Sequence, residues 1–161
     1  MSAALLAGPL GEVTRSVLGD AAFLFCDDLP GDAQPLTGRL AEATISFEAP
    51  CPGRITLRLP WSVALDAAAN LLGTDRDDPE AEQHALAAVG ELLNMISGSA
   101  LQRWFGASGA WALGVPSTRE RVGALPTAAP EGEVVGYAID ELRIEVEAIE
   151  GGGGDDQGPG R

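Results

Sequence analysis

The residues best suited to chemistry in this sequence are a carboxylate and an amide, Glu91 and Asn94. In a helix, residues three positions apart share a face, so the two side chains would project together. Ala87 and Gly98 would lie on the same line, about one turn to either side. A face kept this small lets another surface approach closely. The carboxylate can pair with a cation, and the amide can both donate and accept hydrogen bonds.

The helix that must carry this pair is predicted over residues 79–104. Asp78 and Pro79 are typical of an N-cap and a first helical residue, and Gly106 is typical of a helix end. The apolar residues recur at spacings of three and four, which predicts one buried face. They are Leu86, Val89, Leu93, Ile96, Ala100 and Trp104.

The exposed face of this helix is predicted to suit a partner. Gly90 and Gly98 each cost about 1 kcal/mol relative to Ala inside a helix, so their presence needs a reason. The close approach of a partner surface supplies one. Met95 and Leu101 at the edges of the face would add apolar contact, and Gln102 lies near the same line.

The composition excludes several classes of site. The net charge is −14, and all ten cationic residues are Arg. Without Lys there is neither a Schiff base nor a Walker A loop. The acidic balance argues against binding to nucleic acid or to anionic membranes. His84 is the single histidine, so a His-rich metal site is excluded. Cys26 and Cys51 form no CxxC motif and are predicted to be buried free thiols.

Length and apolar content indicate one domain, predicted over residues 1–150. The remaining residues, 151–161, are predicted to be a disordered, Gly-rich acidic tail because they contain no apolar side chain. No apolar stretch approaches the roughly 20 residues that a transmembrane helix requires, and the N-terminus is a poor signal peptide. We therefore expect a soluble, cytoplasmic protein.

Further elements are predicted around the long helix. A helix is expected within the first twenty residues, and another begins at Ser62 as its N-cap and ends at Gly73. Apolar runs and alternation predict strands at 23–26, 38–48, 54–59, 110–115, 134–138 and 142–149. Strands that follow one another in adjacent pairs favour an α+β fold. We expect a largely antiparallel sheet with the helices packed on one face.

The segment 90–98, Gly-Glu-Leu-Leu-Asn-Met-Ile-Ser-Gly, resembles the ExxN signature helix of the CheC/CheX/FliY family. These proteins remove phosphate from phospho-aspartyl response regulators of the CheY type in bacterial chemotaxis. The acidic start of the helix and the strand followed by a proline, Val115 and Pro116, also resemble the family's layout. The chain contains a single ExxN, which is closest to the CheX-like members.

This resemblance implies a CheX-like fold and a mechanism. Asn94 would orient the water that attacks the aspartyl phosphate, and Glu91 would anchor docking by pairing with a cation of the regulator. Mg²⁺ would be held by the regulator, and this chain would supply no cofactor, metal or nucleophile. The residues implied to contact the partner are Ala87, Met95, Gly98, Leu101 and Gln102. The resemblance also implies a homodimer through the sheets, for which the strand at 142–149 is the expected edge.

Two other interpretations remain beside the phosphatase. The family pattern has Asp or Ser where this chain has Ala87, so the domain could be a non-catalytic module that binds a response regulator or a flagellar-switch component. Alternatively, the fold could serve only for dimerisation, with an inert ExxN. An ExxN spacing also arises by chance in helices, as two ordinary surface residues.

Overall fold

The computed structural model describes residues 3–107, 109–124 and 132–151. The tail predicted over 151–161 lies outside this range from residue 152 onward. In the described part the elements are, in order, α1 (Ala3–Ala22), β1 (Asp27–Asp28), β2 (Arg39–Glu48), β3 (Gly53–Pro60), α2 (Trp61–Leu72), α3 (Pro79–Phe105), β4 (Ala112–Leu113), β5 (Ser117–Val122), β6 (Gly132–Ile139) and β7 (Leu142–Glu150).

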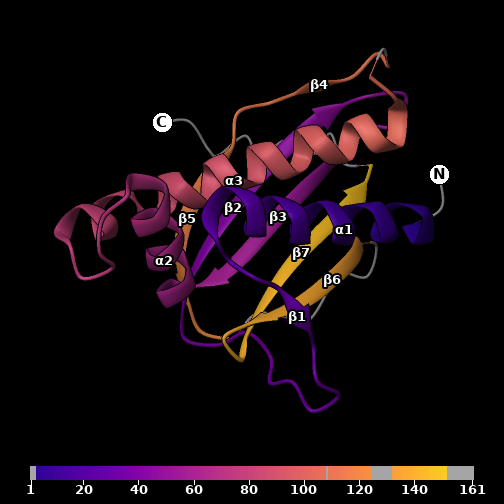
Figure 1. Ribbon diagram of the computed structural model, residues 1–161. Helices are drawn as coiled ribbons and strands as arrows, with labels where there is room; N and C mark the ends of the chain where they lie inside the picture. The colour runs from indigo at the N-terminus through magenta and orange to yellow at the C-terminus, as the bar shows by residue number, and fades with distance from the viewer. Residues whose placement is uncertain (1–2, 108, 125–131, 152–161) are drawn as a thin grey trace, which may run out of the picture.

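The strands form one antiparallel sheet in the order β1-β6-β7-β3-β2-β4, with β5 also pairing β2. The three helices lie on one face of this sheet, with α1 and α3 running across the strands (Figure 1). The predicted α+β fold, with a largely antiparallel sheet and helices on one face, is confirmed. No helix among the described residues is long and apolar enough to cross a membrane.

Alternation along the central strands creates the core. Ile45 of β2, Leu57 of β3 and Val146 of β7 are buried toward the helices, as period-2 patterning predicts. From α3, Val89, Leu93, Ile96 and Ala100 meet them with no exposed surface. Leu86 and Trp104, at the two ends of the same stripe, are half-buried. The core therefore fixes both the height and the rotation of α3 above the sheet.

The helix ends are set by local residues. Asp78 caps α3 by accepting a hydrogen bond from the Glu80 amide at 2.9 Å, and Pro79 is the first helical residue, as predicted. Gly73 ends α2 with a φ of 68°, also as predicted. The predicted N-cap at Ser62 is wrong. Pro60 occupies that position, and the helix begins at Trp61.

Two strand predictions are wrong and one strand is not predicted, while the strand expected at 110–115 is reduced to Ala112–Leu113. The run 23–26 is not a strand, because Phe23 has a φ of 54° and its amide donates to the Gly19 carbonyl to close α1. β7 is not an edge strand, because it pairs with β6 on one side and β3 on the other. The free edges belong to β1 and to β4 and β5. β5 itself was not predicted, because it is polar and mostly exposed.

One end of the sheet lies under α1. The Arg15 guanidinium stands 4.8 Å from the centre of the Tyr137 ring on β6, and burial raises the pKa of Tyr137. Burial also raises the pKa of the Cys26 thiol to about 11. Cys26 and Cys51 are free, as predicted, although both are half-buried rather than fully buried.

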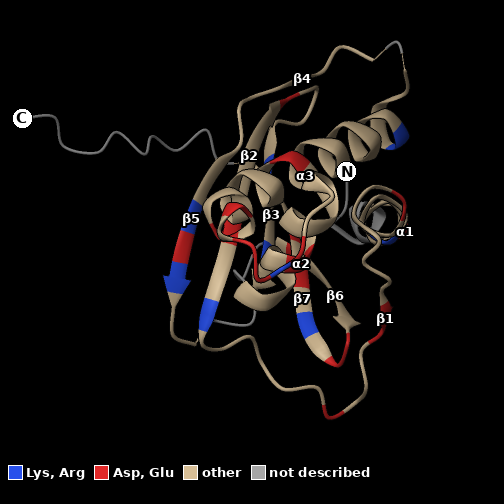
Figure 2. Cartoon of the chain, turned by 60° about the vertical axis from the view of Figure 1, so that its left-hand side comes forward, with Lys and Arg blue, Asp and Glu red and all other residues tan. Residues whose placement is uncertain are grey.

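The face of the sheet away from the helices carries a cluster of charges around Glu42. This carboxylate accepts a hydrogen bond from Arg58 of β3 at 2.8 Å and one from Arg119 of β5 at 2.6 Å. The two strands pair with β2 on its opposite sides. Arg58 also reaches Glu147 at 2.8 Å. Figure 2 shows the alternating charges along β5. Burial opposes the charge on Glu42, but the two guanidinium groups outweigh it and lower the pKa.

We expect Glu42→Ala to lower the free energy of unfolding by about 3 kcal/mol, because it leaves the half-buried Arg58 without that partner. Arg119→Ala should cost about 1 kcal/mol or less, since Arg119 is 66% exposed. The contribution of Glu42 is fully present above its ordinary pKa of 4.5 and is lost progressively as pH falls from that value through the lowered pKa of the folded state. Urea unfolding at pH 7 and pH 4 measures this, and equal losses for both variants would contradict it.

Gly90 of α3 is small because β5 packs against it. A Cβ built at Gly90 would stand 3.0 Å from the Thr118 side-chain methyl and 3.7 Å from Pro116. At Gly98 the nearest atom to such a Cβ belongs to Leu113, at an ordinary 3.8 Å. The expectation that Gly90 is small for a partner is therefore wrong, since the chain's own strand occupies the space.

The two glycines provide a matched test of this packing. Each Gly→Ala change gains about 1 kcal/mol of helix propensity. We expect Gly98→Ala to stabilise the fold by roughly this amount, because its new methyl fits. Gly90→Ala should gain nothing or lose stability, because Thr118 must move. Thermal unfolding of the two variants measures the difference. An equal gain in both would show that β5 does not constrain Gly90.

Candidate functional site

The predicted pair lies on the exposed side of α3. Glu91 and Asn94 are both exposed, one turn apart, while Val89, Leu93 and Ile96 on the opposite side are completely buried. The helix is anchored at its start as well, because Glu82 accepts from Arg39 at 2.8 Å and from the Trp61 indole at 3.1 Å. The site is thus built on a rigid element rather than on a loop.

An open groove of about 400 Å³ lies beside this pair. One wall is α3, and the other is the segment that joins β4 to β5. Its lining residues are Ala87, Gly90, Glu91, Asn94, Gly114, Val115, Pro116 and Thr118. Among them only Glu91 is titratable at ordinary pH, so the groove can donate, accept and pair with a cation but holds no activated nucleophile.

The second wall is fixed to the sheet. The Gly114 amide donates to the Ser46 carbonyl of β2 at 2.8 Å, and Thr118 lies opposite Ala43 of the same strand. Between these two attachments, Val115 is 88% exposed at the rim. Both walls of the groove therefore take their positions from β2, because α3 also packs on that strand.

The residues implied to contact a partner are not equally placed. Ala87 and Met95 are exposed, and Met95 is 39% accessible beside the pair. Gly98 is half-buried near Leu113. Leu101 is completely buried in the core. Its implied contact with a partner is therefore wrong, because its side chain packs in the hydrophobic core and has no exposed surface.

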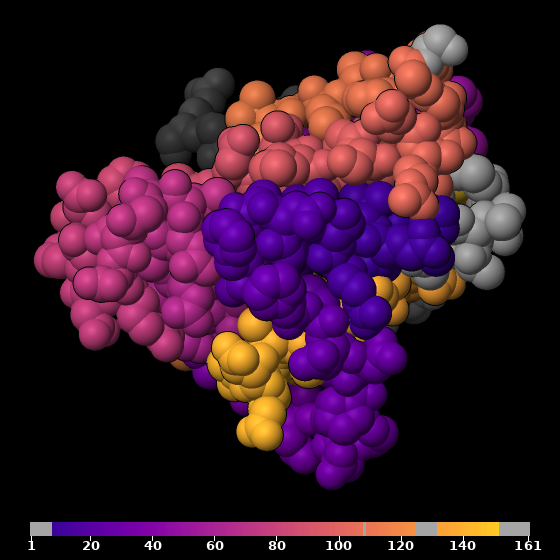
Figure 3. Space-filling model, viewed as in Figure 1, coloured from indigo at the N-terminus to yellow at the C-terminus, as the bar shows by residue number. Residues whose placement is uncertain are grey.

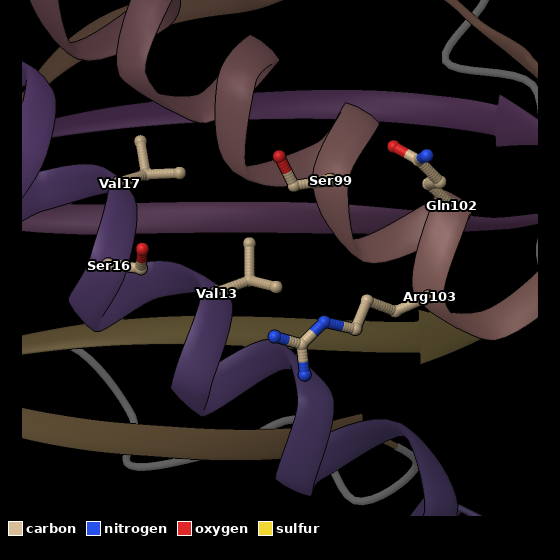
Figure 4. A pocket seen from close by; sticks show the side chains of 6 residues that line it. All are labelled: Val13, Ser16, Val17, Ser99, Gln102 and Arg103. Carbon is tan, nitrogen blue, oxygen red and sulfur yellow. The ribbon is translucent and has the colours of Figure 1, made fainter. Parts of the chain in front are cut away.

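Gln102 lies away from the groove, in a second depression between α1 and α3. This depression has a volume of about 490 Å³ and is lined by Val13, Ser16, Val17, Ser99, Gln102 and Arg103 (Figure 4). Arg103 reaches across to Glu12 of α1 at 2.7 Å. Gln102 is exposed but belongs to this α1 side rather than to the Glu91 groove.

Sequence reasoning missed half of the groove. Val115 and Pro116 were noted only as part of a family layout, and Gly114 and Thr118 not at all. The signal that could have found them is Gly90, because a helix-interior glycine often marks a close approach by another backbone. That signal was attributed to an external partner instead.

No metal site accompanies the groove. Within the part of the chain that the structure describes, His, Cys, Asp and Glu side chains nowhere form a group of three that could hold a metal ion. His84 is exposed on α3, and its Nδ1 lies 2.8 Å from the Glu80 carbonyl of its own helix.

Solved structures share this fold. The CheX proteins of Desulfovibrio desulfuricans and Vibrio vulnificus superpose with TM-scores of 0.70 and 0.72, at 21% and 18% identity. Each match covers 91% of this chain and 99% of the other. CheX in a complex with CheY, BeF₃ and Mg²⁺ from Borrelia burgdorferi gives 0.65 at 18% identity, covering 88% and 95%.

The sequence matches the model of a protein family. No curated protein matches the chain. The family model described as the chemotaxis phosphatase CheX matches residues 42–133. The match includes α3 and both walls of the groove and spans more than half of the chain. This chain therefore belongs to the CheX family of chemotaxis phosphatases.

Proposed function

We propose that this protein dephosphorylates a CheY-type response regulator, with Asn94 and Glu91 as the working side chains. The observation that carries the proposal is their placement: a carboxylate and an amide project together from a rigid helix into an open groove. A protein partner can reach such a groove, whereas a small substrate would find little enclosure there. The complex of CheX with CheY in Borrelia burgdorferi supports a receiver domain as the partner.

The proposed reaction needs only water and the phosphorylated partner. Water attacks phosphorus in line, the bond from phosphorus to the aspartyl oxygen breaks, and inorganic phosphate leaves. The Asn94 side-chain oxygen accepts a hydrogen bond from the water, and its amino group can donate to the phosphoryl group. The contribution of this chain is positioning, so no covalent intermediate forms on it.

Glu91 has a different role in the proposal. Within the described residues it has no ion-pair partner, so its charge is available to a cation of the regulator. We assign Mg²⁺ to the regulator, because the groove lining offers only one carboxylate. Val115 and Met95, both exposed beside the pair, supply apolar contact around it.

The setting of the reaction belongs to the same proposal. Two free thiols fit the reducing cytoplasm, where we place the protein. A homodimer through the sheet would pair one of its free edges, at β1 or at β4 and β5, because β7 is central. The second candidate function is a non-catalytic docking module, which Ala87 favours because it offers the partner no hydrogen-bonding group at that position.

We expect Asn94→Ala to reduce the acceleration of dephosphorylation by about 100-fold, because the water loses its orientation. Glu91→Ala should mainly weaken docking, by about 2 kcal/mol or roughly 30-fold in Kd. The measurement is loss of phosphate from a phosphorylated CheY-type receiver domain with Mg²⁺. Gln83→Ala removes an exposed amide about three turns earlier on the same helix and should change neither quantity.

The outcome also separates phosphatase from docking module. If the receiver binds wild type but loses phosphate no faster than alone, the chain is a docking module. If Asn94→Ala retains the wild-type rate while folded, the proposed role of Asn94 is wrong. Binding is read by fluorescence anisotropy of the labelled receiver, independently of its phosphate.

Ala87 gives a second test of the same mechanism. Ala87→Ser places a hydroxyl on the groove, one turn before Glu91, where it can hydrogen-bond to a docked receiver. We expect a faster reaction by a few fold with unchanged thermal stability, since the position is exposed and small. Single-turnover dephosphorylation at saturating receiver measures it. A slower reaction would indicate that the space above Ala87 must stay empty for docking.

A further inference from the structure

The left-handed, non-glycine residues of the described chain lie at one corner of the molecule, away from the Glu91 groove. They are Phe23, Asp140 and Glu141, with φ values of 54°, 48° and 67°. Residues other than glycine rarely adopt this backbone conformation, and a bulky residue such as Phe is a true outlier there. Residues held in unfavourable conformations cluster at functional sites, so this corner needs its own explanation.

Phe23 occupies a position where glycine is the usual residue. Its amide donates to the Gly19 carbonyl at 3.2 Å and closes α1 in the left-handed cap geometry. Despite this, Phe23 is 65% exposed. Leu24 beside it is buried, and Phe25 is again exposed at 71%. The segment therefore presents two aromatic rings to the outside, anchored by the leucine between them.

The second strained element is the turn between β6 and β7. Ile139 pairs with Leu142, so Asp140 and Glu141 alone form the turn. Positive φ at both positions is the pattern of a type I′ turn, which strongly prefers Asn-Gly. This chain instead carries two exposed carboxylates there, followed by Leu142, which is 41% exposed.

Pairing and packing bring the two strained elements together. β1 begins two residues after Phe25, and its first residue, Asp27, lies opposite Ala138, two residues before the turn. The Asn70 amide of α2 donates to the Ala22 carbonyl at 2.7 Å, which holds the end of α1 in place. In the space-filling view the yellow atoms of the turn adjoin the indigo end of the first helix and the chain that follows it (Figure 3).

The charge of the corner is negative and largely uncompensated. Asp28 pairs with Arg15 at 2.6 Å. Asp20, Asp27, Asp140 and Glu141 have no ion-pair partner within the described residues. An exposed aromatic pair bordered by free carboxylates suits a partner that carries both aliphatic and cationic side chains.

We propose that Phe23 and Phe25, with Asp27, Asp140 and Glu141, form a docking surface for a cationic amphipathic segment of another protein. The rings take the apolar side of that segment, and the carboxylates pair with its Lys or Arg residues. A second copy of this chain fits less well, because it would bring the same carboxylates to the contact. The surface is separate from the groove, since β1 and β5 lie on opposite edges of the sheet.

The first experiment uses a defined probe. The full chain is titrated with a fluorescein-labelled amphipathic helical peptide of Leu and Lys, 18 residues long by design, at about 0.15 M salt to screen weak long-range attraction. We expect Phe23→Gly with Phe25→Ser to weaken binding at least about tenfold. The first change places glycine in a left-handed position, so the variant should remain folded. Its Tm verifies this.

Charge and apolar exposure have separate matched controls. Asp140→Asn with Glu141→Gly creates the preferred turn sequence and removes two charges, and it should weaken binding about fivefold or more. Asp75→Asn with Asp77→Asn removes two exposed charges elsewhere, and Val122→Ser removes an 80% exposed apolar side chain from β5. Both controls should bind within about twofold of wild type, and all variants should keep the wild-type rate of receiver dephosphorylation.

Three results would overturn the proposal. Unchanged peptide affinity in the Phe23 and Phe25 variant would show that the rings do not bind. Equal losses in the Asp75 and Asp77 control would mean that only net charge matters. A wild-type dimer that becomes monomeric in the Phe23 and Phe25 variant, seen by sedimentation, would assign the surface to a second copy.

Discussion

The packing of α3 against β2 and β5 is the constraint on which the rest of the site depends. The buried face of the helix fixes its rotation, and this turns Glu91 and Asn94 outward. Gly90 then allows Thr118 and Pro116 to approach, so the second wall stands close beside the pair. Since β2 holds both walls, the groove is a property of the sheet as much as of the helix.

The charged groups of the molecule fall into two environments. Glu42 and Glu147 are buried on the sheet and held by Arg58, where their charges are used within the fold. Glu91 is exposed and has no such partner in the described residues. A carboxylate committed to internal pairs could not change partners during docking, whereas Glu91 can. The separation lets an acidic protein keep a free carboxylate at its site without disturbing its stability.

Much of the site could be predicted from the sequence, because the start and the buried face of α3 follow from residues that are close together in the chain. Asp78 and Pro79 mark its start, and the stripe through Val89 and Leu93 defines its buried side. Turning Glu91 and Asn94 outward follows from that periodicity alone. The agreement covers those features that depend on residues close together in the chain.

What could not be predicted depends on strand neighbours. Periodicity gives no strand order, so the alternation at 142–149 does not reveal that β7 lies in the centre of the sheet. β5 has too few apolar residues to be predicted from its sequence pattern, and without this strand the reason for Gly90 cannot be seen. The burial of Leu101 in the hydrophobic core is also not predicted by the sequence pattern. Each of these features depends on contacts between residues that are far apart in the chain.

The cations paired with Glu42 are arginines rather than lysines, so high pH affects this cluster less than it affects other parts of the fold. Guanidinium groups remain charged far above the range in which lysine would lose its proton, so this cluster persists in alkali. At high pH the side chains that must lose a proton include Cys26 and Tyr137, whose burial favours their neutral forms. We therefore expect high pH to weaken first the packing of α1 on β6, while the sheet edge beside the groove keeps its structure.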